Sequence, residues 1–321
     1  MNVIDWLLES DPSIGWQVMR DLTDAPADEI TAERAKVANH GWGAQLLALQ
    51  RSDGLWADGG SLADWIFATK QTLHLLRDMG LDPESGAARR AVGLVRDNVT
   101  WLGVLPDDAS WHGKPFFAGE VEPCINGSVA TIGSYFGVDV RPIIDRLLSE
   151  QLDDGGWNCE AMRGSTRGSF NTTIAVLEAL LDHERATGGS GDLTAALGHG
   201  QAYLLTRRLF RRLSTGEPAH PTFTRLGFPT CYHYDVLRGL DHLRAAGVVP
   251  DDRMADAIAI VESKRGVDGR WPLEHAHEGS RLVQMGEDLG TPSRWITLRA
   301  LRVLRWYEDG RIRGNVPPHH G

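Results

Sequence analysis

Apolar side chains recur along this chain every three or four residues, and turns rich in glycine, proline and aspartate interrupt them. This spacing is typical of amphipathic helices that pack on one another. It predicts helices over residues 12–23, 30–50, 61–79, 86–99, 123–136, 139–151, 169–187, 192–210, 230–246, 251–265 and 293–307. The pattern therefore predicts an all-α protein of about six helical hairpins.

Three turns between these helices share one pattern. The central copy, residues 146–158, joins a helix end carrying Gln151 to an Asp-Gly turn closed by Trp157. Near-copies end at Trp56 and Trp271, and the last has Arg265 where glutamine would stand. The tryptophans lie 101 and 114 residues apart, which is twice a unit of about 50 residues and indicates a repeat. The glutamine sits in the last turn of its helix, where we expect its amide to reach exposed carbonyl groups, and we expect the tryptophan to pack across the turn.

These turns resemble the Gln-Trp repeats of the squalene and oxidosqualene cyclases, whose relatives include the protein prenyltransferase β subunits. The resemblance implies an α/α toroid in which inner helices line a central cavity. It assigns the inner ring to residues 12–23, 61–79, 123–136, 169–187, 230–246 and 293–307. We expect residues 1–309 to form a single toroid domain and residues 310–321 to form a flexible tail.

Composition narrows the range of partners and compartments. A chain of 321 residues with 42% hydrophobic content and 11 tryptophans can bury a large core. Its net charge of −10 opposes a nucleic-acid surface, and no apolar run is long enough to span a bilayer. The N-terminus does not resemble a secretory signal, and three cysteines without paired spacing suit a reducing compartment. We therefore expect a cytoplasmic protein with no nucleic-acid partner and no membrane span.

Candidate site residues gather at the predicted starts of the inner helices. In a barrel these starts converge on one mouth and present free N–H groups and positive dipole ends. The candidate catalytic groups are Asp235, Glu122 and His233, and helix capping is the alternative role for the two carboxylates. The candidate substrate-binding residues mix aromatic and polar side chains, as a pocket for an apolar molecule does: Trp111, Phe116, Asn126, Arg167, Asn171, Tyr234, Arg294 and Trp295.

The resemblance implies acid-initiated cyclisation or isomerisation of an isoprenoid or other apolar small molecule. Such a reaction needs a proton donor, and aromatic faces that stabilise the cation. The class II cyclases carry the acid in an Asp-x-Asp-Asp motif that this sequence lacks. The acid would then be a lone carboxyl group, Asp235 or Glu122, with residues 101–119 as a lid that excludes water and with no cofactor.

Two alternatives remain open. Prenyltransferase β subunits bind zinc through an Asp-x-Cys element and a histidine. Glu122-Pro123-Cys124 matches the first element with Glu for Asp, whereas Asn171 stands where the histidine is expected. Cys124 is therefore a candidate zinc ligand, against the alternative of a small buried apolar residue. The other alternative is a non-catalytic toroid that binds a lipid or a protein.

Overall fold

The computed structural model describes residues 2–57, 59–102, 109–230, 232–276, 282, 285 and 287–314. These residues form helices joined by turns, short 3-10 segments and isolated β-bridges, without an extended strand. The α-helices are α1 (Val3–Leu8), α2 (Pro12–Leu22), α3 (Ala27–Ala35), α4 (Gly41–Ala48), α5 (Leu62–Asp78), α6 (Gly86–Asn98), α7 (Pro123–Tyr135), α8 (Arg141–Ser149), α9 (Phe170–Thr187), α10 (Gly191–Thr206), α11 (Val236–Ala245), α12 (Ala255–Ser263) and α13 (Arg294–Gly314). None of the described helices is long and apolar enough to cross a membrane.

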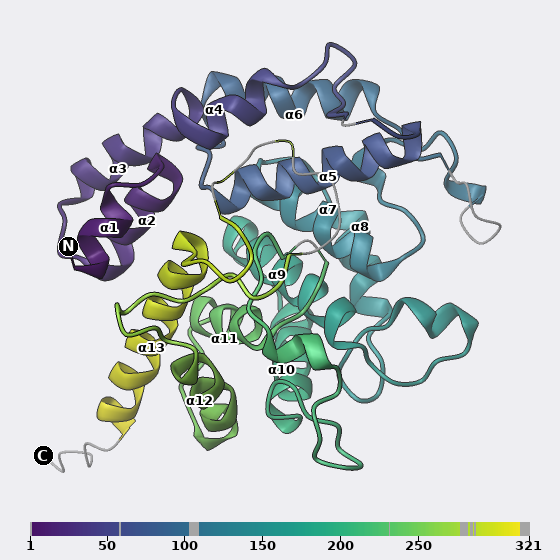
Figure 1. Cartoon of the computed structure of the whole chain (residues 1–321). Helices are drawn as coiled ribbons and strands as arrows, with labels where there is room; N and C mark the ends of the chain where they lie inside the picture. The colour runs from purple at the N-terminus through teal and green to yellow at the C-terminus, as the bar shows by residue number, and fades with distance from the viewer. Residues whose placement is uncertain are drawn as a thin grey trace, which may run out of the picture.

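The helices form an α/α toroid (Figure 1). Helices α5, α7, α9, α11 and α13 follow one another around the interior, and α6, α8, α10 and α12 lie outside them. Helix α13 packs against α2, so the first and last inner helices meet. The indole of Trp16 on α2 donates to the Met79 carbonyl at the end of α5 (2.8 Å), which joins α2 to α5. All six predicted inner helices are confirmed, with shifts at their ends.

The first outer helix differs from its prediction over residues 30–50. Helix α3 ends at Ala35 and α4 begins at Gly41, which has a φ of +67°. A Cβ atom at Gly41 would lie 1.9 Å from Asp11 Oδ2, and the same oxygen accepts a hydrogen bond from the Trp42 backbone nitrogen (2.7 Å). The carboxylate therefore interrupts the helix at a position that only glycine fits.

Two other predicted boundaries are wrong. Helix α11 begins at Val236, after residues 230–235, because the Asp235 side chain accepts the backbone N–H of Arg238 and fixes the N-cap. Helix α13 continues through Gly314, so residues 310–314 are helical where a flexible tail was expected. Residues 315–321 lie outside the described residues.

Three tryptophans bind the outer helices to the inner ring. Trp56, Trp157 and Trp271 are fully buried. Each indole N–H donates to a carbonyl ten residues earlier in the preceding outer helix, namely Leu46, Leu147 and Val261, at 2.7, 2.6 and 2.7 Å. Each backbone N–H donates to a threonine hydroxyl of the following inner helix, namely Thr69, Thr173 and Thr297, at 2.9, 3.0 and 3.0 Å. The three turns are therefore built alike.

The glutamine of the turn joins neighbouring outer helices. The Gln151 amide donates to the Gly155 carbonyl (2.9 Å) and to the Ala196 carbonyl of α10 (2.9 Å). Gln50 makes the two corresponding bonds at the first turn, reaching α6. The amide thus reaches exposed carbonyl groups as expected, one in its own turn and one on the next outer helix. In the third turn the guanidinium of Arg265 lies 5.4 Å from the Trp271 ring instead.

Candidate functional site

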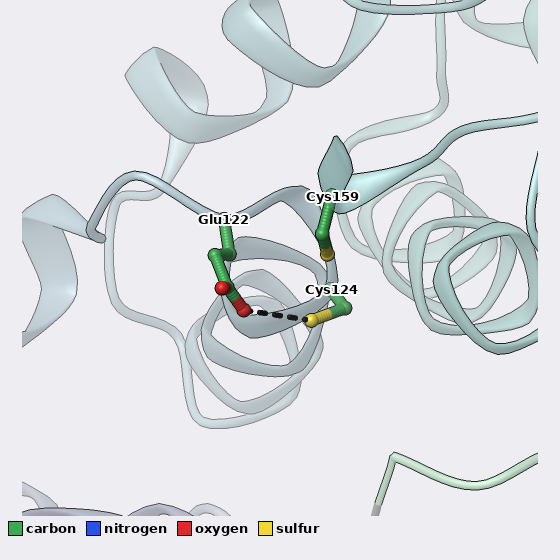
Figure 2. A group of neighbouring side chains, drawn as sticks. All are labelled: Glu122, Cys124 and Cys159. Carbon is green, nitrogen blue, oxygen red and sulfur yellow. Dashed lines mark hydrogen bonds between the residues drawn. The ribbon is translucent and has the colours of Figure 1, made fainter. Parts of the chain in front are cut away.

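Three metal-ligand side chains meet at the start of α7. Glu122 precedes the helix, Cys124 is its second residue, and Cys159 lies in the 3-10 segment that follows the Trp157 turn. Figure 2 shows the three side chains together. Their ligand atoms all lie within 4.8 Å of one another, and the Cys124 thiol donates to Glu122 Oε2 at 3.6 Å.

The pKa values of the two thiols are shifted in opposite directions. A hydrogen bond with Cys159, together with burial, raises the pKa of Cys124, and the positive charge of Lys70 acts in the other direction. The same hydrogen bond lowers the pKa of Cys159 although burial opposes it. Cys159 is therefore the more acidic thiol of the pair and Cys124 the less acidic one. The thiolate is the form of cysteine that binds metals.

The cluster fits a zinc ion. Tetrahedral zinc with a sulfur at about 2.3 Å and an oxygen at about 2.1 Å separates the two ligand atoms by about 3.6 Å. The distance between the Cys124 sulfur and the Glu122 oxygen has this value. Two thiolates and one carboxylate also suit zinc chemically, and three protein ligands leave one coordination position for a substrate.

Asp235 is the N-cap of α11. Its Oδ1 accepts the Arg238 backbone N–H (2.8 Å) and its Oδ2 accepts the Gly227 backbone N–H (3.1 Å). Burial raises the pKa of this carboxyl group, and the charge of Arg299 and the two backbone bonds oppose that rise. Both oxygens are thus used by the backbone, which is the capping role that the sequence left open.

His233 precedes this cap outside α11. Burial, together with the positive charge of His275, lowers the pKa of His233 to about 4. The imidazole is therefore neutral near pH 7. It can serve as a base or a metal ligand, and not as a stored proton.

Three predicted polar residues hold the backbone around the mouth. The Asn126 side chain is buried and bonds to both the N–H and the carbonyl of Glu120, each at 2.8 Å. The Asn171 carbonyl oxygen accepts the Tyr234 backbone N–H (2.8 Å). The hydroxyl of buried Tyr234 donates to the Leu209 carbonyl (2.6 Å). These groups have structural partners, so they shape the mouth.

The predicted aromatic residues do not form one wall. Phe116 is fully buried and stacks on Trp101 with ring centres 5.3 Å apart, so it belongs to the core. The half-buried Trp111 ring is covered by Lys114 (3.8 Å) and Arg146 (5.1 Å). The lid predicted over residues 101–119 is described only in part, because residues 103–108 lie outside the described residues.

The remaining predicted residues separate. Arg167 is exposed. The guanidinium of Arg294 lies over Trp6 at 4.6 Å. Trp295 is buried and stacks on Phe228 at 4.3 Å, and these two rings line a central cavity. Of the predicted site residues, Glu122 and Cys124 are brought together with a third ligand, Cys159.

The cavity has a volume of about 740 Å³ and opens toward the C-terminal ends of the inner helices. Its wall carries ion pairs, and one of them joins the buried Arg238 to Glu178 through two bonds of 2.8 and 2.6 Å. Burial acts to raise the pKa of Glu178, but the charge and the bonds of Arg238 lower it to about 2. The carboxylate is therefore ionised in the interior.

Sequence reasoning missed two groups of residues. Cys159 lies 35 residues from Cys124, and only the fold brings the two together. The charged cavity wall did leave a signal, because Arg238, Asp241 and His242 interrupt an otherwise apolar inner helix at helical spacing. Buried charges need partners, so such positions indicate an interior polar network.

No family model matches the chain, and no curated protein does. The solved structures similar to it include these three. The apo type II terpene cyclase MstE from Scytonema is 15% identical over 94% of this chain and 88% of its own, with a TM-score of 0.45. A variant of that cyclase in complex with merosterolic acid A is 16% identical over 94% and 86%, with a TM-score of 0.45. A protein from Actinoplanes is 16% identical over 93% and 90%, with a TM-score of 0.43.

Proposed function

We propose that this chain is a zinc-dependent enzyme that acts on an isoprenoid or similarly apolar substrate at the N-terminal mouth of its inner helices. The observation that carries the proposal is the meeting of Glu122, Cys124 and Cys159, from two separate segments, in a three-ligand arrangement. Zinc bound by three protein ligands supplies a Lewis acid that activates a thiol or an oxygen at its open position.

The surrounding residues hold the ligands in place. The Arg146 guanidinium donates to the carbonyls of Glu120 and Val121, each at 2.6 Å, and fixes the segment that carries Glu122. The Trp157 turn fixes Cys159 two residues later. These contacts preorganise the ligands before a metal binds.

The resemblance in sequence suggests transfer of an isoprenoid group to a thiol. In that reaction the ionised sulfur of the acceptor thiol forms a bond to the allylic carbon of the isoprenoid donor. The leaving group of the donor departs with the electrons of the broken carbon–oxygen bond. The protein's part is to keep the sulfur ionised and to exclude water from the allylic carbon.

Metal analysis of the purified chain tests the proposal. We expect about one zinc ion per chain in the wild type and at least a tenfold loss of zinc affinity in Cys124→Ser and in Cys159→Ser. Glu160→Gln, at an exposed position beside Cys159, is the matched control and retains the metal. A cobalt-substituted sample should show thiolate-to-cobalt absorption that weakens in each cysteine variant. Zinc retained in both cysteine variants would refute the assignment.

Acid-initiated cyclisation is the second candidate, since burial raises the pKa of Asp235. The rings of Phe170 and Phe223 lie 5.1 Å from the neighbouring Tyr234 ring and could shield a cation. The test is a panel of linear isoprenoids incubated with metal-free protein. Turnover that is lost in Asp235→Asn and Glu122→Gln variants of normal melting temperature would support this candidate. An absence of turnover with and without zinc would favour a binding protein.

A further inference from the structure

The cavity at the C-terminal ends of the inner helices has an excess of positive charge. Among the described residues, eight arginines and five carboxylates line it, together with His74 and His242. Asp21, outside the lining, pairs with Arg20 and Arg302 and offsets part of the difference. Several arginines share carboxylates, and the clearest case is Asp241, which accepts hydrogen bonds from Arg244 (2.9 Å), Arg299 (3.2 Å) and Arg302 (2.9 Å). One carboxylate therefore faces three guanidinium groups.

Some of these guanidinium groups keep free donors. Arg244 and Arg299 bond to Asp241 through Nε, and their terminal nitrogens bond to no described residue. Arg34 donates to the Gly80 carbonyl (2.9 Å) and the Tyr135 hydroxyl (3.0 Å), and within the described part of the chain no carboxylate pairs with it. The wall thus offers charge and hydrogen-bond donors beyond what its own carboxylates use.

Helix ends account for only part of this charge, because five of the eight arginines stand in the last turn of a helix and three do not. The five are Arg20, Arg34, Arg77, Arg185 and Arg244. A helix C-terminus carries partial negative charge that arginines in its last turn offset. Arg238, however, is the third residue of α11. Arg299 and Arg302 lie in the first half of α13, which ends at Gly314. Their charges are remote from the last turns of their helices.

A second observation points to a ligand. His242 is 4% exposed and lines the cavity, yet neither ring nitrogen has a hydrogen-bond partner among the described residues. The indole nitrogen of Trp295, also in the wall, is likewise buried and without a described partner. A buried polar group without a partner costs about 1–3 kcal/mol. Such groups are retained at sites where a ligand supplies the missing bonds.

We propose that this cavity binds a small anion carrying phosphate or carboxylate groups, at a site separate from the Glu122–Cys124–Cys159 cluster. The free terminal nitrogens of Arg244 and Arg299 and the guanidinium of Arg34 contact its oxygens. Arginine suits this task because its planar fork matches both groups. The volume of about 740 Å³ holds a molecule larger than a single phosphate.

Calorimetric titration with inorganic pyrophosphate and with succinate, at ionic strength fixed by sodium chloride, tests the proposal. We expect saturable binding to the wild type. The dissociation constant should be at least tenfold larger in Arg34→Gln and in Arg299→Gln. Arg141→Gln, which removes an exposed arginine paired with Asp139, is the matched control and binds like the wild type. The response to pyrophosphate against succinate tells which anionic group the site prefers.

Two further variants keep the result interpretable. His242→Phe conserves most of the ring volume and removes the two unpartnered nitrogens, so it should fold normally and bind the anion more weakly. Cys124→Ser should bind pyrophosphate as the wild type does, because the site is remote from the thiols. The proposal is overturned if wild-type heats equal those with sodium chloride alone, or if affinity is unchanged in both Arg34→Gln and Arg299→Gln. It is also overturned if Cys124→Ser abolishes binding, since pyrophosphate would then be chelating the metal.

Discussion

The two ends of the same six inner helices are stabilised by different chemistry. At the N-terminal ends, side chains bond mainly to backbone groups: Asp235 caps α11 and Asn126 holds the Glu120 segment. At the C-terminal ends, side chains bond to one another as ion pairs, such as Arg77 with Asp182. The first end positions one cluster of ligands mainly through bonds to the backbone, and the second is a charged cavity.

Backbone polarity explains the difference. Helix starts need acceptors for their free N–H groups, so carboxylates there are used as caps. Helix ends need donors, which Arg34 and Trp16 supply to the carbonyls of Gly80 and Met79. Acids placed deeper in the cavity therefore pair with arginine side chains. We expect salt and acid to have little effect on the stability of the N-terminal end. Both should lower the stability of the C-terminal end.

The largest expected effect concerns the N-terminal end. Replacing Trp157 with alanine removes a fully buried indole and its bond to Leu147, and should cost about 3–5 kcal/mol of unfolding free energy. Urea denaturation at low and high salt should give the same loss, since no charge is involved. Trp111→Ala, at a half-buried ring, is the control and should cost less. A loss that depends on salt would contradict the comparison.

The next effect concerns the charged wall of the cavity, where Glu178 pairs with Arg238. Glu178→Gln leaves the charge of Arg238, which is 2% exposed, without its partner, and should cost about 3 kcal/mol. Chemical denaturation near pH 7 measures the loss. Asp139→Asn, which breaks an exposed pair with Arg141, should leave the denaturation midpoint unchanged. Equal midpoints for Glu178→Gln and the wild type would show that the buried pair is not stabilising.

Acid should remove the stability that the Glu178–Arg238 ion pair contributes. The pKa of Glu178 is about 2 in the fold, below its ordinary value of 4.5, so the carboxylate contributes stability above about pH 4.5. That contribution is lost as the pH falls from 4.5 toward 2. The difference in unfolding free energy between the wild type and Glu178→Gln should therefore narrow over this range. A constant difference would mean that Glu178 does not titrate there.

The smallest effect returns to the N-terminal end. Gln151→Ala removes two hydrogen bonds to the carbonyls of Gly155 and Ala196, and should cost about 1–2 kcal/mol. Gln50→Ala should behave alike, because its bonds match. Thermal melts of both variants, measured beside Glu178→Gln and Asp139→Asn, compare how much the hydrogen bonds and the ion pairs stabilise the fold. A loss of stability as large as that of Trp157→Ala would show that the Gln151 amide stabilises the turn as much as the indole does.

The sequence predicts local features of this molecule far better than contacts between distant segments. Helical spacing located the inner helices, and the three tryptophan turns follow from Asp-Gly-type reversals and a large aromatic residue. The sequence did not identify Cys159 as a site residue, because its distance from Cys124 depends on how two hairpins pack. Asp235 was ambiguous because the same carboxylate can cap a helix or donate a proton, and only its partners decide.

The meeting of α13 with α2 bears on how the chain is made. Arg302 donates to Gln17 across 285 residues of sequence (3.1 Å), so the ring cannot close until α13 has left the ribosome. Earlier hairpins can pack as they emerge, but each growing arc exposes the unfilled side of its last inner helix. Synthesis therefore passes through open, horseshoe-like intermediates whose exposed apolar edges favour chaperone binding, and the ring closes only after α13 has been made.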